Sequence, residues 1–361
     1  MRGNALIQML SGRYHQGRGV IGKLSEEALL LGRRAHIIAD EAAWAKFGGA
    51  VLAPLDAAGV TASVFTFTGL CSPEHYDAAA KAGEGAQLVI GVGGGRAMDA
   101  SKIAADKLGV RVICVPTSAS TCASTAWLSV HYENDGPMIG NYWSRYSPFA
   151  TIAELDFIAL DCPPRLLAAG ILDAMAKYPE ITYNIRHLTS FEVNAFSHTA
   201  AGIAKDMFFY LLQNGEEAIR ACQRGEIGQR EEDVICYAVA VAGLTSVLAC
   251  GGKQAAVSHS LYASFCSLYP ELAHRFVHGE LVSASMPYQM AVTGIEQQTI
   301  DAYAAFARAF GSPVCLTDLG LAPDEAAMDA IFEDLRRRMP VQTQEEYDRL
   351  RSMQALLIRY P

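Results

Sequence analysis

The sequence has few charged residues and no excess of basic ones. Of its 361 residues 19% are charged, and 29 Lys and Arg stand against 38 Asp and Glu, a net charge of −9. An acidic chain has little attraction for nucleic acid or an anionic membrane surface, so we expect neither as a partner. The 51% content of hydrophobic residues excludes an intrinsically disordered chain.

Paired cysteines and an apolar leader are also lacking. The nine cysteines form no CxxC pair and mostly stand in apolar runs, which is typical of reduced thiols in a cytoplasmic protein. The N-terminus has no apolar segment followed by a small-residue cleavage site, so we expect no signal peptide. The longest charge-free apolar stretch, 234–252, is bracketed by Asp233 and Lys253, and no second one exists. A buried core helix is therefore expected there, and no membrane span.

Length and periodicity predict two domains. A chain of 361 residues corresponds to about two domains. In residues 1–161, short apolar runs rich in β-forming residues alternate with alanine-rich stretches of helical spacing. This alternation predicts a nucleotide-binding α/β domain with a parallel, doubly wound sheet. The expected strands are 35–39, 60–68, 87–92 and 112–115, with a last short strand at 149–154.

After Asp161 the alternating pattern nearly vanishes. Asp161-Cys162-Pro163-Pro164 has the polar cap and early prolines of a helix start. Segments rich in Ala and Leu follow, which predicts an all-helical second domain over 162–361. The expected helices are 164–178, 190–214, 215–225, 230–250, 253–268, 280–293, 296–309, 323–337 and 343–358.

A glycine-rich turn follows the third expected strand. Gly93, Gly94 and Gly95 end the apolar run, and Arg96 and Asp99 then stand in the first turns of an expected helix. Glycines let backbone N–H groups approach an anion, and a helix N-terminus adds partial positive charge. The turn therefore favours a pyrophosphate, although its spacing is not G-x-G-x-x-G. A tight turn with no ligand is the alternative.

Polar residues end two other expected strands. Asp40 could accept from both ribose hydroxyls of an adenosine and repel a 2′-phosphate, or simply cap the helix that starts at Glu41. Thr117, Ser118 and Ser120 follow the strand at 112–115. Because ligands of open α/β sheets gather beyond the carboxyl ends of the strands, the glycine turn and this hydroxyl run should face one crevice.

The helical region contains isolated metal-ligand types. Asp173 is a lone carboxylate in an apolar stretch, and His259 and His278 stand among small or apolar residues. One carboxylate and two imidazoles suit a divalent transition metal with an open position. Two alternatives stay open from spacing alone. A core histidine often just bonds a backbone carbonyl, and His274 could share a helix face with His278 and compete as a ligand.

These motifs together resemble the glycerol-dehydrogenase branch of the iron-containing (group III) alcohol dehydrogenases, over nearly the whole chain. Six segments stand in the order and spacing of that family. They are Gly12–Gly17, Gly93–Lys102, Pro116–Thr121, Leu128–Tyr132, Ala169–Glu180, and His259 with His278–Gly279.

The resemblance implies a fold and a chemistry. It implies a dehydroquinate synthase-like or glycerol dehydrogenase-like fold, NAD, one divalent metal (Zn²⁺ or Fe²⁺), a small-molecule alcohol substrate and a homo-oligomer. The implied metal ligands, which are also catalytic, are Asp173, His259 and His278. His274 is a possible proton relay. The implied cofactor contacts are Asp40, Gly94, Gly95, Thr117, Ser120, Leu128 and Tyr132. Within the same motifs, Gly93, Arg96, Asp99 and Ser118 are also predicted to bind the cofactor.

One departure from the family pattern bears on the substrate. Glycerol dehydrogenases have an Asp after PTxAST that contacts polyol hydroxyls, and here that position is Cys122. A thiol cannot accept two O–H bonds as a carboxylate does. With Trp127 nearby, Cys122 resembles a sub-branch acting on 2-hydroxy or 2-oxo carboxylic acids, unless it is simply a buried thiol.

Further departures concern the metal region. Leu172 replaces the usual Gly before the metal Asp, Tyr178 and Pro179 alter the KWxE motif, and Tyr262 stands within the altered HxxHNG. Three alternatives to a hydroxy-acid enzyme therefore remain: glycerol dehydrogenase proper, a dehydroquinate-synthase-like lyase, and an inactive family member with a binding role. The lyase is disfavoured because 156–213 holds only four Lys and Arg for a phosphate clamp.

Overall fold

The computed structural model describes residues 10–361 except 135, 137, 188–192, 250–254 and 340–342. The described chain divides into two compact units. The α/β unit comprises 8–167 and 219–244, and the helical unit comprises 168–218 and 245–361. The segment 219–244 thus returns to the first unit, and the domain boundary expected at residue 161 stays a prediction.

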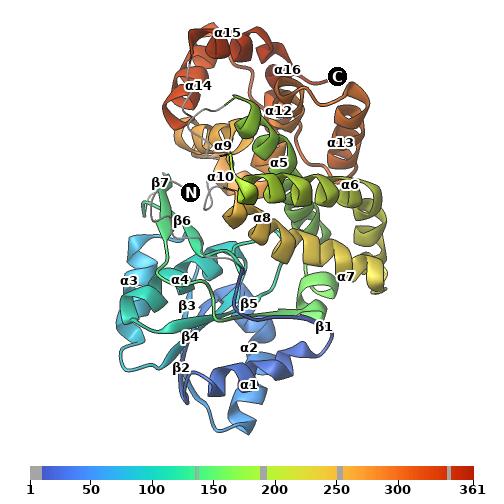
Figure 1. Ribbon diagram of the computed structural model, residues 1–361. Helices are drawn as coiled ribbons and strands as arrows, with labels where there is room; N and C mark the ends of the chain where they lie inside the picture. The colour runs from blue at the N-terminus through green and yellow to red at the C-terminus, as the bar shows by residue number, and fades with distance from the viewer. Residues whose placement is uncertain (1–9, 135, 137, 188–192, 250–254, 340–342) are drawn as a thin grey trace. The chain divides into compact units, whose positions relative to one another are not determined.

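The α/β unit is built on a six-stranded parallel sheet (Figure 1). The expected strands are confirmed, but the first strand was missed because its four residues, YHQG, carry no apolar run. In spatial order the strands are β1 (Tyr14–Gly17), β8 (Ala150–Glu154), β5 (Arg111–Pro116), β4 (Leu88–Gly93), β2 (Arg34–Asp40) and β3 (Thr61–Phe67).

Helices cover both faces of this sheet, which is why the middle portions of its central strands are largely apolar. Ile37 of β2 lies in one core cluster with α1 (Lys23–Leu29) and α2 (Glu41–Ala57). The next residue, Ile38, lies in the other cluster with α3 (Pro73–Ala82) and α4 (Gly95–Leu108). Successive side chains of this strand therefore pack against helices on opposite faces of the sheet.

The chain order creates a switch point between β2 and β4. From β2 the chain passes through α2 to β3 at one edge, whereas β4 pairs on the other side of β2 and leads to β5. Ligands of open α/β sheets bind where the strand order reverses. Asp40 ends β2 and Gly93 ends β4, so both stand at this point.

A second, antiparallel ribbon in the α/β unit was not expected. Strands β6 (Leu128–Tyr132) and β7 (Met138–Trp143) pair as a hairpin with an irregularity at His131/Tyr132. The remaining described helices of this unit are a 3-10 turn at Val20–Gly22, π-helical segments at Asp156–Leu160 and Tyr237–Val241, and α7 (Gln229–Cys236).

The helical unit confirms the expected all-α region. Several helix bounds differ from expectation. α5 continues past Pro179, and α6 runs unbroken through Gly215, where a break was expected. The expected helices 280–293 and 343–358 are each divided into two. The helices are α5 (Pro164–His187), α6 (Ala195–Gln223), α8 (Ala242–Leu248), α9 (Val257–Leu268), α10 (Leu272–Arg275), α11 (His278–Ser283), α12 (Met286–Thr293), α13 (Gln297–Ala309), α14 (Glu325–Arg338), α15 (Gln344–Ser352) and α16 (Gln354–Ile358), with a 3-10 turn at Leu316–Leu319.

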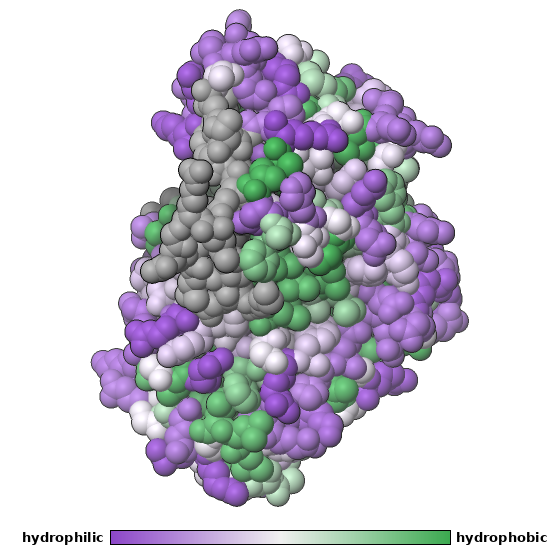
Figure 2. Space-filling model, viewed as in Figure 1, coloured by the Kyte–Doolittle hydropathy of each residue, from purple (hydrophilic) through white to green (hydrophobic). Residues whose placement is uncertain are grey.

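Within the described residues, no helix is both long and apolar enough to cross a membrane. On the face drawn in Figure 2, hydrophilic residues cover much of the surface and apolar residues gather in separate groups. No disulfide joins the eight described cysteines, and Cys250 lies outside the described residues.

Candidate metal centre and cofactor turn

Three helices of the helical unit bring the predicted metal ligands together. Asp173 comes from α5, His259 from α9 and His278 from the first position of α11. One ligand atom from each lies within 4.8 Å of the others. Asp173 Oδ1 is 3.2 Å from His259 Nε2 and 3.5 Å from His278 Nε2. The side-chain types and their convergence fit a single divalent transition metal.

Positive charge and hydrogen bonds keep Asp173 ionised. Its side chain is only 4% exposed, and burial alone would raise its pKa. The Lys177 ammonium, 2.8 Å from Oδ1, and hydrogen bonds from His259 and His278 outweigh burial and hold that pKa well below its usual range. A deprotonated carboxylate is the form that binds a metal.

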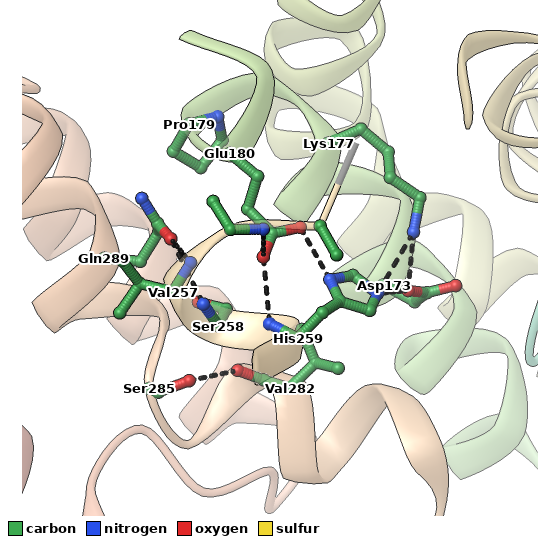
Figure 3. A network of polar contacts seen from close by, with 12 residues as sticks. Asp173, Lys177, Pro179, Glu180, Val257, Ser258, His259, Val282, Ser285 and Gln289 are labelled. Carbon is green, nitrogen blue, oxygen red and sulfur yellow. Dashed lines mark hydrogen bonds and ion pairs between the residues drawn. The ribbon is translucent and has the colours of Figure 1, made fainter. Parts of the chain in front are cut away.

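A second carboxylate orients His259. Glu180, fully buried on α5, lies 2.6 Å from His259 Nδ1 and also accepts from the backbone N–H groups of His259 and Ala256 (Figure 3). Burial would lower the pKa of His259, but the facing carboxylates raise it. A Glu180 partner at Nδ1 directs the lone pair of Nε2 toward the ligand set when the ring is neutral.

Gln289 completes the support of α9. Its Oε1 accepts from the N–H groups of Val257 and Ser258 (Figure 3). Its Nε2 donates to Thr293 Oγ1. The first N–H groups of a helix have no partner within the helix. Here Gln289 and Glu180 satisfy them from neighbouring helices, so the helix end carrying His259 is fixed from two sides.

The other imidazole depends on a close contact between helices. At Gly279, next to His278, an added Cβ would lie 1.9 Å from the carbonyl oxygen of Ala169 on α5. Glu280 accepts from the Val277 N–H and so closes the start of α11. The His278 ring contacts Tyr262 edge to face at 4.4 Å. Backbone contact and ring packing therefore set the place of this ligand.

The structure distinguishes between His274 and His278 as candidate metal ligands. His274 is exposed on α10, and the group of possible ligands found among the described residues contains His278 instead. A proton-relay role for His274 stays a prediction.

In the α/β unit, the predicted cofactor residues gather at the switch point. Gly93 has φ 142°, and an added Cβ would lie 3.0 Å from Asp40 Cβ. Gly94 caps α4, and Gly95 begins it close to Thr121. At Gly93 and Gly95 these contacts leave no room for a side chain, so the backbone of the turn is open to an anion. Asp40 does cap α2 through the Ala43 N–H, as the alternative interpretation predicted.

The hydroxyl run lies beside this turn. The Thr117 N–H donates to the Gly93 carbonyl at 2.9 Å, and Ser118 Oγ is 3.1 Å from Ser120 Oγ. Cys122, which is partly exposed, follows in the same loop. The glycine turn and the hydroxyl run therefore do share one end of the sheet, as expected.

The other predicted cofactor residues flank this region. Leu128 and Tyr132, both partly exposed, begin and end β6, and Arg96 is exposed in the first turn of α4. Asp99 points elsewhere: its buried carboxylate lies 3.0 Å from Lys102 Nζ and accepts from the Val130 N–H. Burial raises the pKa of Asp99, and Lys102 opposes that shift.

The sequence predicted the three metal ligands but not the residues that hold them in place. Glu180 stands seven residues after Asp173, a spacing that places both on one helix face and could have signalled a shared site. Lys177 stands between them on the same face. Gln289 gave no such signal, because its role depends on the packing of α12 against α9.

Comparison with known proteins gives the chain its family. The iron-containing alcohol dehydrogenase family matches residues 11–153. A glycerol dehydrogenase of Escherichia coli O6:H1 is 30% identical over 319 residues, which cover 88% of this chain and 85% of that protein. The chain belongs to the iron-containing alcohol dehydrogenases.

A second relative and a solved structure bear on the activity and the fold of the chain. Hydroxycarboxylate dehydrogenase A of Escherichia coli K12 is 29% identical over 254 residues, 70% of this chain and 68% of that protein. A glycerol dehydrogenase structure from Schizosaccharomyces pombe covers 98% of this chain and 91% of its own, with 23% identity and a TM-score of 0.84, and confirms the fold. The protein is thus an NAD-dependent, metal-containing dehydrogenase of alcohols, acting on a small molecule.

Proposed function

We propose that this dehydrogenase interconverts a 2-hydroxy acid and its 2-oxo acid, with Asp173, His259 and His278 as its metal ligands. The observation that carries the proposal is the convergence of these three side chains within 4.8 Å. A divalent metal bound there supplies Lewis-acid polarisation of the substrate oxygen, and NAD supplies the hydride chemistry.

The surrounding residues hold the ligands in their reactive forms. Lys177 and the two imidazoles keep Asp173 deprotonated. Glu180 accepts a hydrogen bond from Nδ1–H of the neutral His259 ring, which leaves the lone pair of Nε2 for the metal. Gly279 lets α11 approach α5 closely enough for His278 to reach the same point. The protein's part is therefore to preorganise the site before substrate binds.

The switch point of the α/β unit supports cofactor binding there. We assign the pyrophosphate to the turn Gly93–Gly95 at the start of α4, where a helix N-terminus and open backbone N–H groups favour an anion. Asp40, at the adjacent strand end, is assigned to the adenosine ribose and favours NAD over its 2′-phosphorylated relative. Thr117, Ser118, Ser120, Leu128 and Tyr132 are assigned to the rest of the cofactor.

Cys122 is the reason to prefer an acid over a polyol. A substrate carboxylate would be repelled by an Asp at this position and is tolerated by a neutral thiol. The similarity to hydroxycarboxylate dehydrogenase A supports the same choice. Glycerol oxidation is the second candidate, supported by the similarity to glycerol dehydrogenases over most of the chain. We further propose a cytoplasmic homo-oligomer, which size-exclusion chromatography with light scattering would test.

The test is NADH oxidation by protein of known metal content, with a panel of 2-oxo acids and dihydroxyacetone. Turnover of an oxo acid with one equivalent of metal is expected. Asp173→Ala and His278→Ala should lose both metal and turnover. The matched control is His274→Ala, four residues away and exposed, which should keep its metal.

Three results would contradict the proposal. Turnover of dihydroxyacetone alone would move the protein to the polyol branch. Full activity after complete removal of metal would refute the metal role. Absence of both metal and turnover would favour an inactive member with a binding role.

A further inference from the structure

One buried lysine in the α/β unit is surrounded by backbone carbonyl groups. The side chain of Lys102 on α4 is fully buried. Its Nζ donates to the carbonyl oxygens of Ala123 at 2.8 Å, Ala126 at 3.1 Å and Leu128 at 2.5 Å. An ammonium group has three donors and no acceptor. Three of its contacts thus go to the segment 123–128, which comprises the end of the connection from β5 to β6 and the first residue of β6.

Asp99, one turn earlier on α4, is the ion-pair partner of Lys102. Its Oδ1 lies 3.0 Å from Lys102 Nζ, and its Oδ2 accepts from the Val130 N–H at 3.2 Å. Ser129 Oγ donates to the Asp99 carbonyl oxygen. A buried cation is costly unless it is paired and hydrogen-bonded, and here it is both. The pair therefore fixes the loop and the start of β6 to α4.

The clamped segment lies between two groups of proposed ligand contacts. Thr117, Ser120 and Cys122 precede it; Leu128 is its last residue and begins β6, which ends at Tyr132. A second attachment comes from Thr125, whose Oγ1 donates to the Val239 carbonyl at 2.7 Å, in the π-helical segment 237–241. The loop is thus held at its middle and at its end.

We propose that Lys102 and Asp99 are positioning residues for catalysis: without touching the cofactor, they fix the segment 123–128 so that Leu128 and the residues on either side of the segment bind NADH. The inference rests on the proposed function, since it assumes that these residues contact the cofactor. It gives Asp99 a different part from the direct cofactor contact that the sequence suggested. The carboxylate that faces Lys102 and β6 is committed to those partners.

The tryptophans of this region supply a local spectroscopic readout. Trp127 lies between two carbonyls that Lys102 binds, and its ring centroid is 4.9 Å from that of Trp143 on β7 at 54°. Two indoles in this arrangement should couple and give an exciton couplet in circular dichroism. Loss of the couplet reports movement of the segment, whereas a general loss of stability elsewhere leaves it in place.

The test compares Lys102→Met with a matched variant on the same helix. Lys107→Met removes an exposed lysine paired with Asp77 at 2.7 Å, so it should change neither the couplet nor NADH affinity. Lys102→Met should abolish the couplet and raise the NADH dissociation constant about ten- to a hundredfold. Val51→Ala, in the core on the other face of the sheet, matches the expected loss of stability and should keep the couplet.

A second variant guards against misfolding. Asp99→Asn with Lys102→Met removes both charges, so no lone carboxylate stays buried, and it should show the same two losses. A couplet that persists in the folded variants, or an NADH affinity within twofold of the wild type, would overturn the inference. Wild-type protein that binds no NADH would instead refute the proposed function.

Discussion

Gly279→Ala is the substitution for which the structure makes the sharpest prediction. The new Cβ would lie 1.9 Å from the Ala169 carbonyl oxygen, and contacts below 3.0 Å essentially never occur. The backbones of α11 and α5 must therefore move apart until that distance reaches at least 3.0 Å. His278 is the preceding residue, so it moves with α11.

A movement of this size exceeds what metal coordination tolerates. Metal–ligand distances in protein sites vary by only about 0.2 Å. We expect the substitution to weaken metal binding about a hundredfold or more, because one of three ligands is displaced. We also expect a loss of about 1 to 3 kcal/mol in unfolding free energy from overpacking.

The assay is competition with a chromogenic chelator, followed by metal analysis and thermal unfolding. Gly202→Ala is the matched control: it lies in α6, an added Cβ there meets nothing within 4 Å, and it should leave metal affinity unchanged. Unchanged metal affinity in Gly279→Ala would refute the argument that the contact between α11 and α5 positions His278.

Three further predictions follow from single side chains. Cys122→Asp should raise glycerol oxidation relative to 2-oxo acid reduction about tenfold, since a carboxylate accepts polyol hydroxyls and repels an acid; an unchanged ratio of kcat/KM values would mean that Cys122 does not set specificity. Asp334→Asn should cost about 1 kcal/mol above pH 5, measured by urea unfolding. Burial would raise the pKa of Asp334, but hydrogen bonds from Arg338, Ser264 and Arg337 lower it from its ordinary value. The stabilisation is therefore full above the ordinary pKa of an Asp and is lost as the pH falls through the lowered pKa; a cost that does not decline on acidification would contradict this. Asp40→Asn should keep the stability of the protein and reduce its preference for NADH over NADPH, measured as the ratio of kcat/KM values; an unchanged ratio would remove Asp40 from the cofactor site.

The sequence predicts those elements whose burial leaves a pattern. β4 is buried at every position and appears as an apolar run, as do the middle of β2 and most of β5. β1 and the hairpin strand β7 have intermediate or exposed positions throughout, so no apolar run marks them. α6 runs on through Gly215, where the sequence predicted a break between two helices.

The metal site, too, was predictable from the sequence only in part. Asp173 is recognisable as a lone carboxylate in an apolar helix, because a buried charge needs a partner. That His278 rather than His274 joins it depends on α11 packing against α5 through Gly279, which spacing alone does not contain. The resemblance to a family supplied the choice, and the contact explains it.

Asp40 shows that a structural and a functional interpretation of one residue can both hold. Its Oδ1 accepts from the Ala43 N–H at 3.1 Å, which is an ordinary helix cap. A carboxylate has a second oxygen, and the residue ends the strand next to Gly93, where open sheets bind ligands. Asn caps helices as well as Asp does but carries no charge. Asp40→Asn therefore separates the two roles: the cap should survive, and only discrimination against a 2′-phosphate should be lost.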